Sequence, residues 1–235
     1  MSAKGKIYKL FPFIPRTNLA IGQKIHSIKT KLNAGKIRKI LSNQVGLYAN
    51  IGCGDLGISE NWVNLDNSKY KNVTFVFDCR KDLPFASNTV KGIFCEHFFE
   101  HLDYSDEVPY FLKSCYNGLE MGGVLRIIVP DAEKYLIGYC QEGWDYLIKT
   151  RPLDKNLNDK LMNIQYQTKM QLVNEVFRQS GQHKYAWDFE TLKLALSAVG
   201  FSDISKMDYM KSKDPKLEID QPIRMHESLY VDAIK

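Results

Sequence analysis

Residues 47–57 read LYANIGCGDLG, and residues 62–66 read WVNLD. Two short apolar runs separated by a glycine-rich segment are typical of two strands joined by a tight connection. Gly52 and Gly54 allow the backbone to turn sharply and to approach a ligand without interference from a Cβ atom. Asp66 ends the second run, and its carboxylate can accept hydrogen bonds from two neighbouring hydroxyls. The pattern therefore predicts a site for a cofactor that carries a nucleoside.

The glycines also fit G-x-G-x-x-G over residues 52–57, a spacing found in dinucleotide-binding folds. In those folds a helix follows the glycines and holds a pyrophosphate at its N-terminus. Only residues 58–61 separate Gly57 from the next apolar run, which is too short a segment for such a helix. The spacing favours a cofactor without a pyrophosphate, and a nicotinamide oxidoreductase is kept as a competing hypothesis.

Two further strand-like runs end in carboxylates. Residues 73–77 read VTFVF before Asp78, and residues 90–95 read VKGIFC before Glu96. In open α/β sheets, ligands bind beyond the carboxyl ends of the strands. We therefore expect Asp66, Asp78 and Glu96 to line one crevice together with the two glycines.

Taken together, these motifs resemble those of the class I S-adenosylmethionine-dependent methyltransferases. The resemblance covers residues 47–131 and 186–235 and is strongest to the small bacterial type associated with surface-polysaccharide biosynthesis. The matching segments are NIGCG at 50–54, WVNLD at 62–66, DLPF at 82–85, EHFFEHL at 96–102, LEMGG at 119–123, WDFETL at 187–192, AVGF at 198–201 and SLYVDA at 228–233. The resemblance implies an α/β fold with a Rossmann-like, seven-stranded, mostly parallel sheet, helices on both faces and an antiparallel last strand.

The same resemblance implies S-adenosylmethionine as the cofactor. It assigns the backbone of Gly52 and Gly54 to the methionine moiety and Asp66 to the ribose hydroxyls. The residues that it brings to the cofactor are Asn50, Gly52, Gly54, Asp66, Asp78, Cys79 and Glu96. Asp78 and Cys79 fall at the adenine edge, whereas Glu96 falls beside the sulfonium.

The expected reaction is in-line transfer of a methyl group to an acceptor that the protein aligns. Residues 129–131 read VPD where nitrogen methyltransferases carry N-P-P-Y or D-P-P-Y, so a hydroxyl acceptor on a sugar, a glycan or a small metabolite is our first hypothesis. A hydroxyl has to lose a proton, and histidine is the side chain best suited to remove it near neutral pH. His97 and His183 are the candidate bases, and Asp131 is the next candidate.

The chain divides into a basic arm at residues 1–44 and a methyltransferase domain at residues 45–235. Apolar periodicity predicts a helix over residues 106–119 and an insertion over residues 132–185, with helical patterns at 132–148 and 157–179. The insertion is rich in tyrosine, glutamine and asparagine, side chains that can bind a polar ring. It follows the fifth strand, and we expect it to act as a substrate lid.

Residues 1–44 hold eight lysines, two arginines and no acidic residue, although the whole chain has a net charge of only +5. Ile21, Ile25, Ile28 and Leu32 predict an amphipathic helix that is interrupted near Gly35. We expect this helix to pack on the sheet, with peripheral contact to anionic lipid as the alternative. Nucleic acid is not expected as a partner because no reading element follows the arm. Neither a signal peptide nor an apolar span is apparent, which favours a cytoplasmic location.

A zinc hydrolase and a catalytically silent scaffold are two competing hypotheses. HFFEH at residues 97–101 satisfies the zinc-peptidase pattern H-x-x-E-H, in which the two histidines lie on one helix. Here the run follows a strand and precedes a turn, so we expect no metal. The scaffold would retain the methyltransferase fold without activity, because Asn50 and Leu56 depart from the usual cofactor-binding pattern. The oligomeric state is left open.

Overall fold

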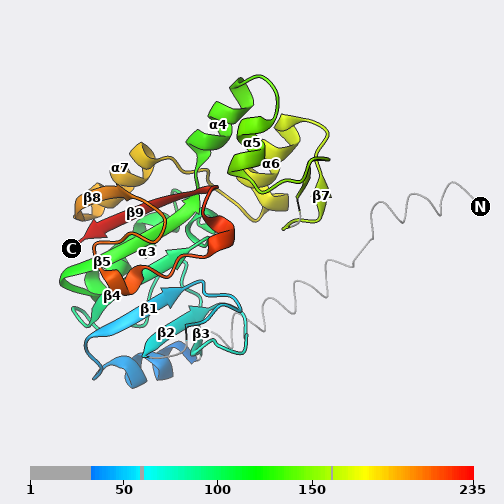
Figure 1. Cartoon of the computed structure of the whole chain (residues 1–235). Coiled ribbons are helices and arrows are strands. Elements are labelled where there is room, and N and C mark those ends of the chain that lie inside the picture. The colour runs from blue at the N-terminus through cyan, green and yellow to red at the C-terminus, as the bar shows by residue number, and fades with distance from the viewer. Residues whose placement is uncertain (1–32, 59–60, 160) are drawn as a thin grey trace, which may run out of the picture.

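A computed structural model of the chain describes residues 33–58, 61–159 and 161–235. Seven strands form one sheet in the order β3-β2-β1-β4-β5-β9-β8 (Figure 1). These strands are β1 (Leu47–Ile51), β2 (Trp62–Asp66), β3 (Phe75–Val76), β4 (Val90–Glu96), β5 (Leu119–Pro130), β8 (Ser202–Met207) and β9 (Ser228–Ile234). The first five run parallel, whereas β9 is antiparallel to both β5 and β8. The predicted mostly parallel sheet with an antiparallel last strand is confirmed.

The connections at the start of the sheet are turns. Residues 52–58, between β1 and β2, contain no helix, and Gly52 and Gly54 have φ angles of 68° and 53°. Such angles are strained for residues with a Cβ atom, which explains the two glycines. The prediction that no full helix follows the glycines holds for these residues.

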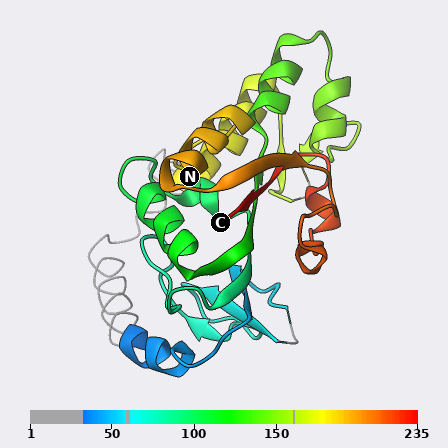
Figure 2. The ribbon, with the colours of Figure 1, turned by 90° about the vertical axis from the view of Figure 1, so that its left-hand side faces the viewer.

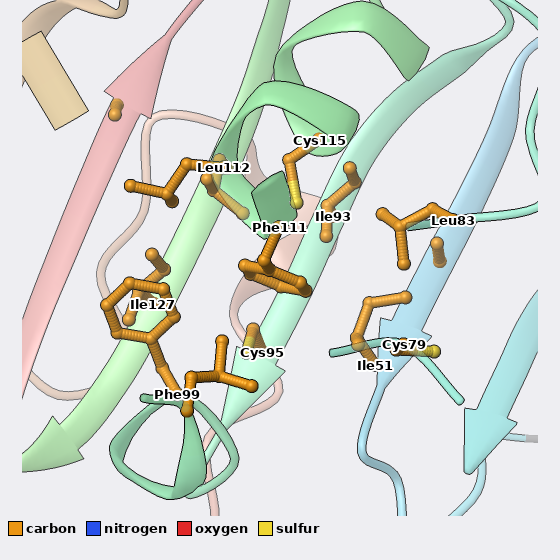
Figure 3. Close-up of a cluster of buried hydrophobic side chains, with 14 of the residues drawn as sticks. Ile51, Cys79, Leu83, Ile93, Cys95, Phe99, Phe111, Leu112, Cys115 and Ile127 are labelled. Carbon is orange, nitrogen blue, oxygen red and sulfur yellow. The ribbon is translucent and has the colours of Figure 1, made fainter. Parts of the chain in front are cut away.

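One face of the sheet is covered by helices. The helix α3 (Val108–Gly118) places Phe111, Leu112 and Cys115 against strand residues such as Ile93 (Figure 3). The helix α7 (Phe189–Val199) joins the same core through Leu192 and Leu196. This is the largest cluster of buried apolar side chains in the described part of the chain, and its burial is the main stabilising contribution to the fold.

The other face of the sheet is covered by the connection between β8 and β9, residues 208–227. This segment contains two short 3₁₀ helices, η3 (Pro215–Leu217) and η4 (Pro222–Arg224). Leu217 is fully buried against Tyr48 of β1 and Phe94 of β4. Figure 2 shows this segment on the side of the sheet opposite α3. It occupies the face that helices after β1 and β2 cover in a doubly wound fold.

The insertion after β5 forms a separate small layer beyond the carboxyl ends of the strands (Figure 1). Its elements are α4 (Ala132–Cys140), α5 (Asp145–Thr150), the hairpin β6 (Asn158–Asp159) and β7 (Ile164–Gln165), α6 (Lys169–Arg178) and the 3₁₀ helix η2 (Gln179–Gly181). The predicted helix over residues 157–179 is therefore wrong in its first half, where the hairpin stands. Thr168 starts α6 instead, because it forms a capping box with Gln171.

Of the basic arm, the structure describes only the last part, and residues 1–32 lie outside it. Residues 33–41 are helical, and the helix continues through Gly35, where the sequence predicts an interruption. Ile37 and Leu41 are buried in the main core, and Arg38 forms an ion pair with Asp82. Packing on the sheet is thus confirmed for this part. Among the described helices, none is long and apolar enough to cross a bilayer.

Candidate functional site

Asp66 and the glycine turn are held together by hydrogen bonds. Gly52 N donates to Leu65 O over 2.9 Å, which keeps the turn beside β2. Gly54 N donates to Asp66 Oδ2 over 2.9 Å, and Ser68 N donates to Asp66 Oδ1 over 2.7 Å. Each carboxylate oxygen retains a second lone pair, and the side chain is only half-buried. The carboxylate is therefore fixed in position and still able to accept hydrogen bonds from a ligand.

The side chain of Asn64 also stabilises the glycine turn, although the sequence motifs did not indicate this residue. Its Oδ1 accepts from Ile58 N over 2.9 Å, and its Nδ2 donates to Ile58 O over 2.6 Å. Asn50 Nδ2 also donates to Asn64 Oδ1, over 3.2 Å. A polar residue inside the run WVNLD is the signal that could have identified Asn64, because buried amides need partners.

The two glycines differ in their surroundings. A Cβ atom added to Gly52 would lie 2.6 Å from Cβ, Cγ and Cδ2 of Phe98, so this glycine makes room for an aromatic side chain. A Cβ atom added to Gly54 would meet no atom within 4 Å, so the surface at Gly54 is open. The open side of the turn therefore lies at Gly54 and Asp66.

The predicted cofactor residues do not all line one crevice. Asn50, Gly52 and Glu96 share a small cavity that Gln221 helps to close. Glu96 Oε1 accepts from Gln221 N over 3.1 Å, and burial raises the pKa of this carboxyl group. Asp78 lines a different cavity. The expectation of a single crevice is corrected in this respect.

Asp78 and Cys79 follow the strand-like run at residues 73–77, and their side chains differ in exposure to solvent. Asp78 pairs with Arg80, whose Nη2 lies 2.6 Å from Oδ2. Cys79 is buried, its Sγ contacts Phe77 O at 3.7 Å, and burial raises the pKa of its thiol well above the ordinary value. Because the Cys79 side chain is buried, only the backbone of this residue is suited to contact a ligand at this edge of the sheet.

His97 directly follows β4 in a left-handed conformation, with φ at 50°. Its Nδ1 lies 3.2 Å from Glu100 Oε1, and its Nε2 lies 3.0 Å from Ser228 Oγ. His97 and His183 line one cavity between the sheet and the insertion. The structure thus brings the two predicted histidines to one cavity, although they are far apart in sequence.

Glu100 connects these two histidines. It is 2% exposed, and His183 Nε2 lies 3.8 Å from its Oε1. His101 packs edge-on against the His183 ring, with the centroids 4.7 Å apart. The sequence pattern indicated Glu100 and His101 but not their proximity to His183.

Asp131 has a structural role in the described part of the chain. It caps α4, because its side chain accepts from Glu133 N over 3.2 Å. Lys206 and Lys134 lie 3.7 Å and 4.0 Å from its Oδ2. Burial raises the pKa of this carboxyl group. Asp131 is absent from the lining of the His97 cavity, so the structure does not bring it together with the histidines.

One family model matches part of the chain. Residues 34–127 match the family model described as a methyltransferase domain. This segment contains β1 to β4 with the glycine turn and most of β5. No curated protein sequence matches the chain. The family match supports a methyltransferase that uses S-adenosylmethionine.

Three solved structures are similar at low sequence identity. A SAM-dependent methyltransferase from Archaeoglobus fulgidus is 17% identical, with a TM-score of 0.49 over 88% of this chain and 94% of its own. A methyltransferase from Mesorhizobium loti is 13% identical, with a TM-score of 0.48 over 86% and 97% of the two chains. A protein from Thermotoga maritima, described as a possible histamine N-methyltransferase, is 15% identical, with a TM-score of 0.47 over 98% and 99%.

The residues at the glycine turn fit an adenosine-bearing cofactor at two points. The anchored Asp66 carboxylate suits two ribose hydroxyls, and the open surface at Gly54 leaves room for a ligand to approach the backbone. Phe98 covers Gly52 itself, so a bound methionine moiety has to pass on the Gly54 side or displace the ring.

Proposed function

We propose that this protein transfers a methyl group from S-adenosylmethionine to a hydroxyl acceptor, which is a sugar, a glycan of the surface-polysaccharide type or a small metabolite. The observation that carries the proposal is Asp66, held by two backbone amides beside an open glycine turn. The family match over residues 34–127 supports it. The choice of a hydroxyl acceptor rests on residues 129–131, which lack the motif of nitrogen methyltransferases.

The bound cofactor would supply an activated methyl group on a sulfonium. Asp66 would accept hydrogen bonds from the ribose, and Asp78 would contact the adenine edge. Asn50 and Glu96 lie in the cavity beside the turn and would face the methionine end. The contribution of these residues is to bind and orient the donor, because alignment of donor and acceptor is the main requirement for transfer.

His97 is our first candidate for the base that removes the acceptor proton. Glu100 lies against Nδ1 and stabilises the protonated ring, while Nε2 faces Ser228 Oγ at the cavity. A base oriented by a buried carboxylate is a common catalytic arrangement. His183 is the second candidate, but its Nδ1 is held by Val176 O.

The binding site is tested by Asp66→Ala. Loss of charge-assisted hydrogen bonds to the ribose should lower the affinity for S-adenosylhomocysteine about ten- to hundredfold, as measured by calorimetric titration. Asp145→Ala is the matched control, because it removes an exposed carboxylate from α5. Unchanged affinity in Asp66→Ala would refute the site assignment.

The base is tested by His97→Asn. Asparagine tolerates the left-handed backbone of this position, so the fold should be retained. Turnover should fall at least about tenfold with little change in S-adenosylhomocysteine affinity, and the acid limb of the pH profile should disappear. His226→Asn, an exposed histidine, serves as the control. Full turnover in His97→Asn would redirect the search to His183.

A non-catalytic scaffold is the second candidate function, and the contact between Phe98 and Gly52 favours it. A scaffold should show neither heat nor a thermal shift with millimolar S-adenosylhomocysteine. Phe98→Ala removes the ring that lies over Gly52. This variant distinguishes a cofactor site that Phe98 blocks from the absence of any cofactor site. Binding that appears only in this variant would mean that the aromatic ring closes a functional pocket.

A further inference from the structure

Glu100, His101 and His183 form a cluster that the proposed methyl transfer does not use as a group; we call it the Glu100 cluster. One potential ligand atom from each residue lies within 4.8 Å of the other two. The cluster joins η1 (Phe99–His101), which follows β4, to the segment that leads back from the insertion. Lys184 N donates to Glu100 O over 2.8 Å, so the backbone fixes the two segments together.

The hydrogen bonds of the two histidines leave one nitrogen of each ring available. His101 Nδ1 lies 3.2 Å from Gln182 O, and His183 Nδ1 lies 2.6 Å from Val176 O. A carbonyl oxygen only accepts, so both Nδ1 atoms carry the proton and both Nε2 atoms keep a lone pair. Metal-binding histidines are held in this way, with the second ring nitrogen donating to a carbonyl.

Glu100 supplies an independent observation. It is 2% exposed, and neither carboxylate oxygen accepts a well-aligned hydrogen bond from the described residues. The nearest cationic candidate is His97 Nδ1, 3.2 Å from Oε1. A buried carboxylate without hydrogen bonds is costly unless a cation accompanies it. The second oxygen is therefore suited to act as a ligand atom for a cation.

We propose that the Glu100 cluster binds one divalent transition-metal ion, with His101 Nε2, His183 Nε2 and a Glu100 oxygen as ligands. Two imidazoles and a carboxylate form a donor set that suits zinc and other first-row ions. All three residues line the cavity that His97 also lines, so a further coordination position faces this cavity. The ion would clamp the insertion onto the end of β4.

This site differs from the peptidase pattern and from the expectation that no metal binds. In H-x-x-E-H peptidases the first and last histidines are ligands on one α-helix, and the glutamate activates water. Here residues 99–101 form a 3₁₀ turn, and His97 contacts Glu100 instead of completing the cluster. His183, contributed by the insertion, takes its place.

The test uses the full-length protein stripped with a chelator and then titrated with zinc chloride. After desalting, plasma emission should find one zinc per chain. Zinc at about a hundredfold excess over its dissociation constant should raise the melting temperature by about 5 °C. A cobalt-loaded sample should show visible absorption bands from the bound ion.

The variants decide whether the metal lies at the Glu100 cluster. His183→Ala and Glu100→Gln should each lose more than nine-tenths of the zinc and the thermal shift, whereas His226→Ala should keep both. Circular dichroism of the metal-free variants confirms folding, and His101→Gln replaces either variant that fails to fold.

Wild-type protein that retains no zinc, or variants that retain it, would overturn the proposal. Zinc content and S-adenosylhomocysteine affinity are measured separately, so the metal site and the methyltransferase function can fail independently.

Discussion

Two buried ionic groups, at Arg126 and at Glu100, differ in how completely hydrogen bonds compensate their charges. Arg126 of β5 is fully buried under the 208–227 connection, and Glu100 is buried beneath the insertion. Arg126 has partners for every part of its guanidinium, whereas the oxygens of Glu100 lack well-aligned hydrogen bonds among the described residues. A closed network stabilises a structure, while an open one leaves a position for a ligand.

Three residues accept hydrogen bonds from the Arg126 guanidinium. Asp220 accepts two hydrogen bonds, from Nε over 2.8 Å and from Nη2 over 2.6 Å. Asp232 accepts from Nη1 over 2.8 Å, and the carbonyl of Lys211 accepts from the same atom over 2.8 Å. Desolvation is thus compensated at each nitrogen, and this network attaches the 208–227 connection to the sheet.

The largest effect on stability is predicted for Arg126→Met, which removes the cation of the closed network. Asp220 and Asp232 would stay buried without a cation, which should lower the free energy of unfolding by about 3–5 kcal/mol in urea titrations. Adding Asp220→Asn and Asp232→Asn should recover part of that loss. A decrease below about 1 kcal/mol would contradict the comparison, because it would mean that the network contributes little.

The second-largest effect is the contribution of Glu227 to the pH dependence of stability. Glu227 is buried between Arg151 and Arg224. Burial raises the pKa of Glu227, but Arg151, His97 and Arg224 together outweigh it and lower the pKa to about 2. A folded-state pKa below the unfolded value stabilises the protein above about pH 5, and this contribution is lost as the pH falls toward 2. The loss should be roughly 2–3 kcal/mol.

Denaturant unfolding at pH 7, 5 and 3.5 measures the Glu227 contribution. Glu227→Gln should be less stable than wild type at pH 7 and should lose less stability on acidification. Parallel pH profiles for the two proteins would show that other carboxylates control the acid response.

The smallest effect is expected for Glu100→Gln in metal-free protein. The neighbouring histidines lower the pKa of Glu100 despite its burial, and the amide loses this attraction. Because the amide can still accept a hydrogen bond from His97, stability should fall by no more than about 1 kcal/mol. Thermal and urea unfolding of the stripped proteins measure this change. A loss of several kcal/mol would mean that Glu100 belongs to a closed network after all.

The local parts of the fold could be predicted from the residues themselves, the sheet as a whole only through the family resemblance, and the contacts made by the insertion not at all. The β1–turn–β2 unit follows from apolar runs and glycines that lie close together along the chain. The contact between Glu100 and His183 depends on how the insertion folds back, and no local pattern encodes it. Asp131 stays a candidate only from sequence, because the structure shows it as the cap of α4, a role that residues after a strand often have.

The single crevice failed as a prediction for a geometric reason. Carboxyl ends of neighbouring strands share an edge of the sheet, but side chains that follow them can turn toward either face. Glu96 turns to the face covered by Gln221, while Asp78 lines the cavity beside α3 with Glu107. That these strands end at one edge of the sheet was predictable, whereas the face that each terminal side chain selects depends on packing by distant segments.

The cover that residues 208–227 place on the sheet has a consequence for the order of folding. Tyr48 donates a hydrogen bond to Asp214, a partner 166 residues later in the chain. During synthesis, β1 and β4 leave the ribosome long before the segment that covers Tyr48 and Phe94 exists. High contact order of this kind slows folding and leaves apolar surface exposed to aggregation or chaperones. Emergence of residues 208–227 from the ribosome is thus a precondition for closing this half of the core.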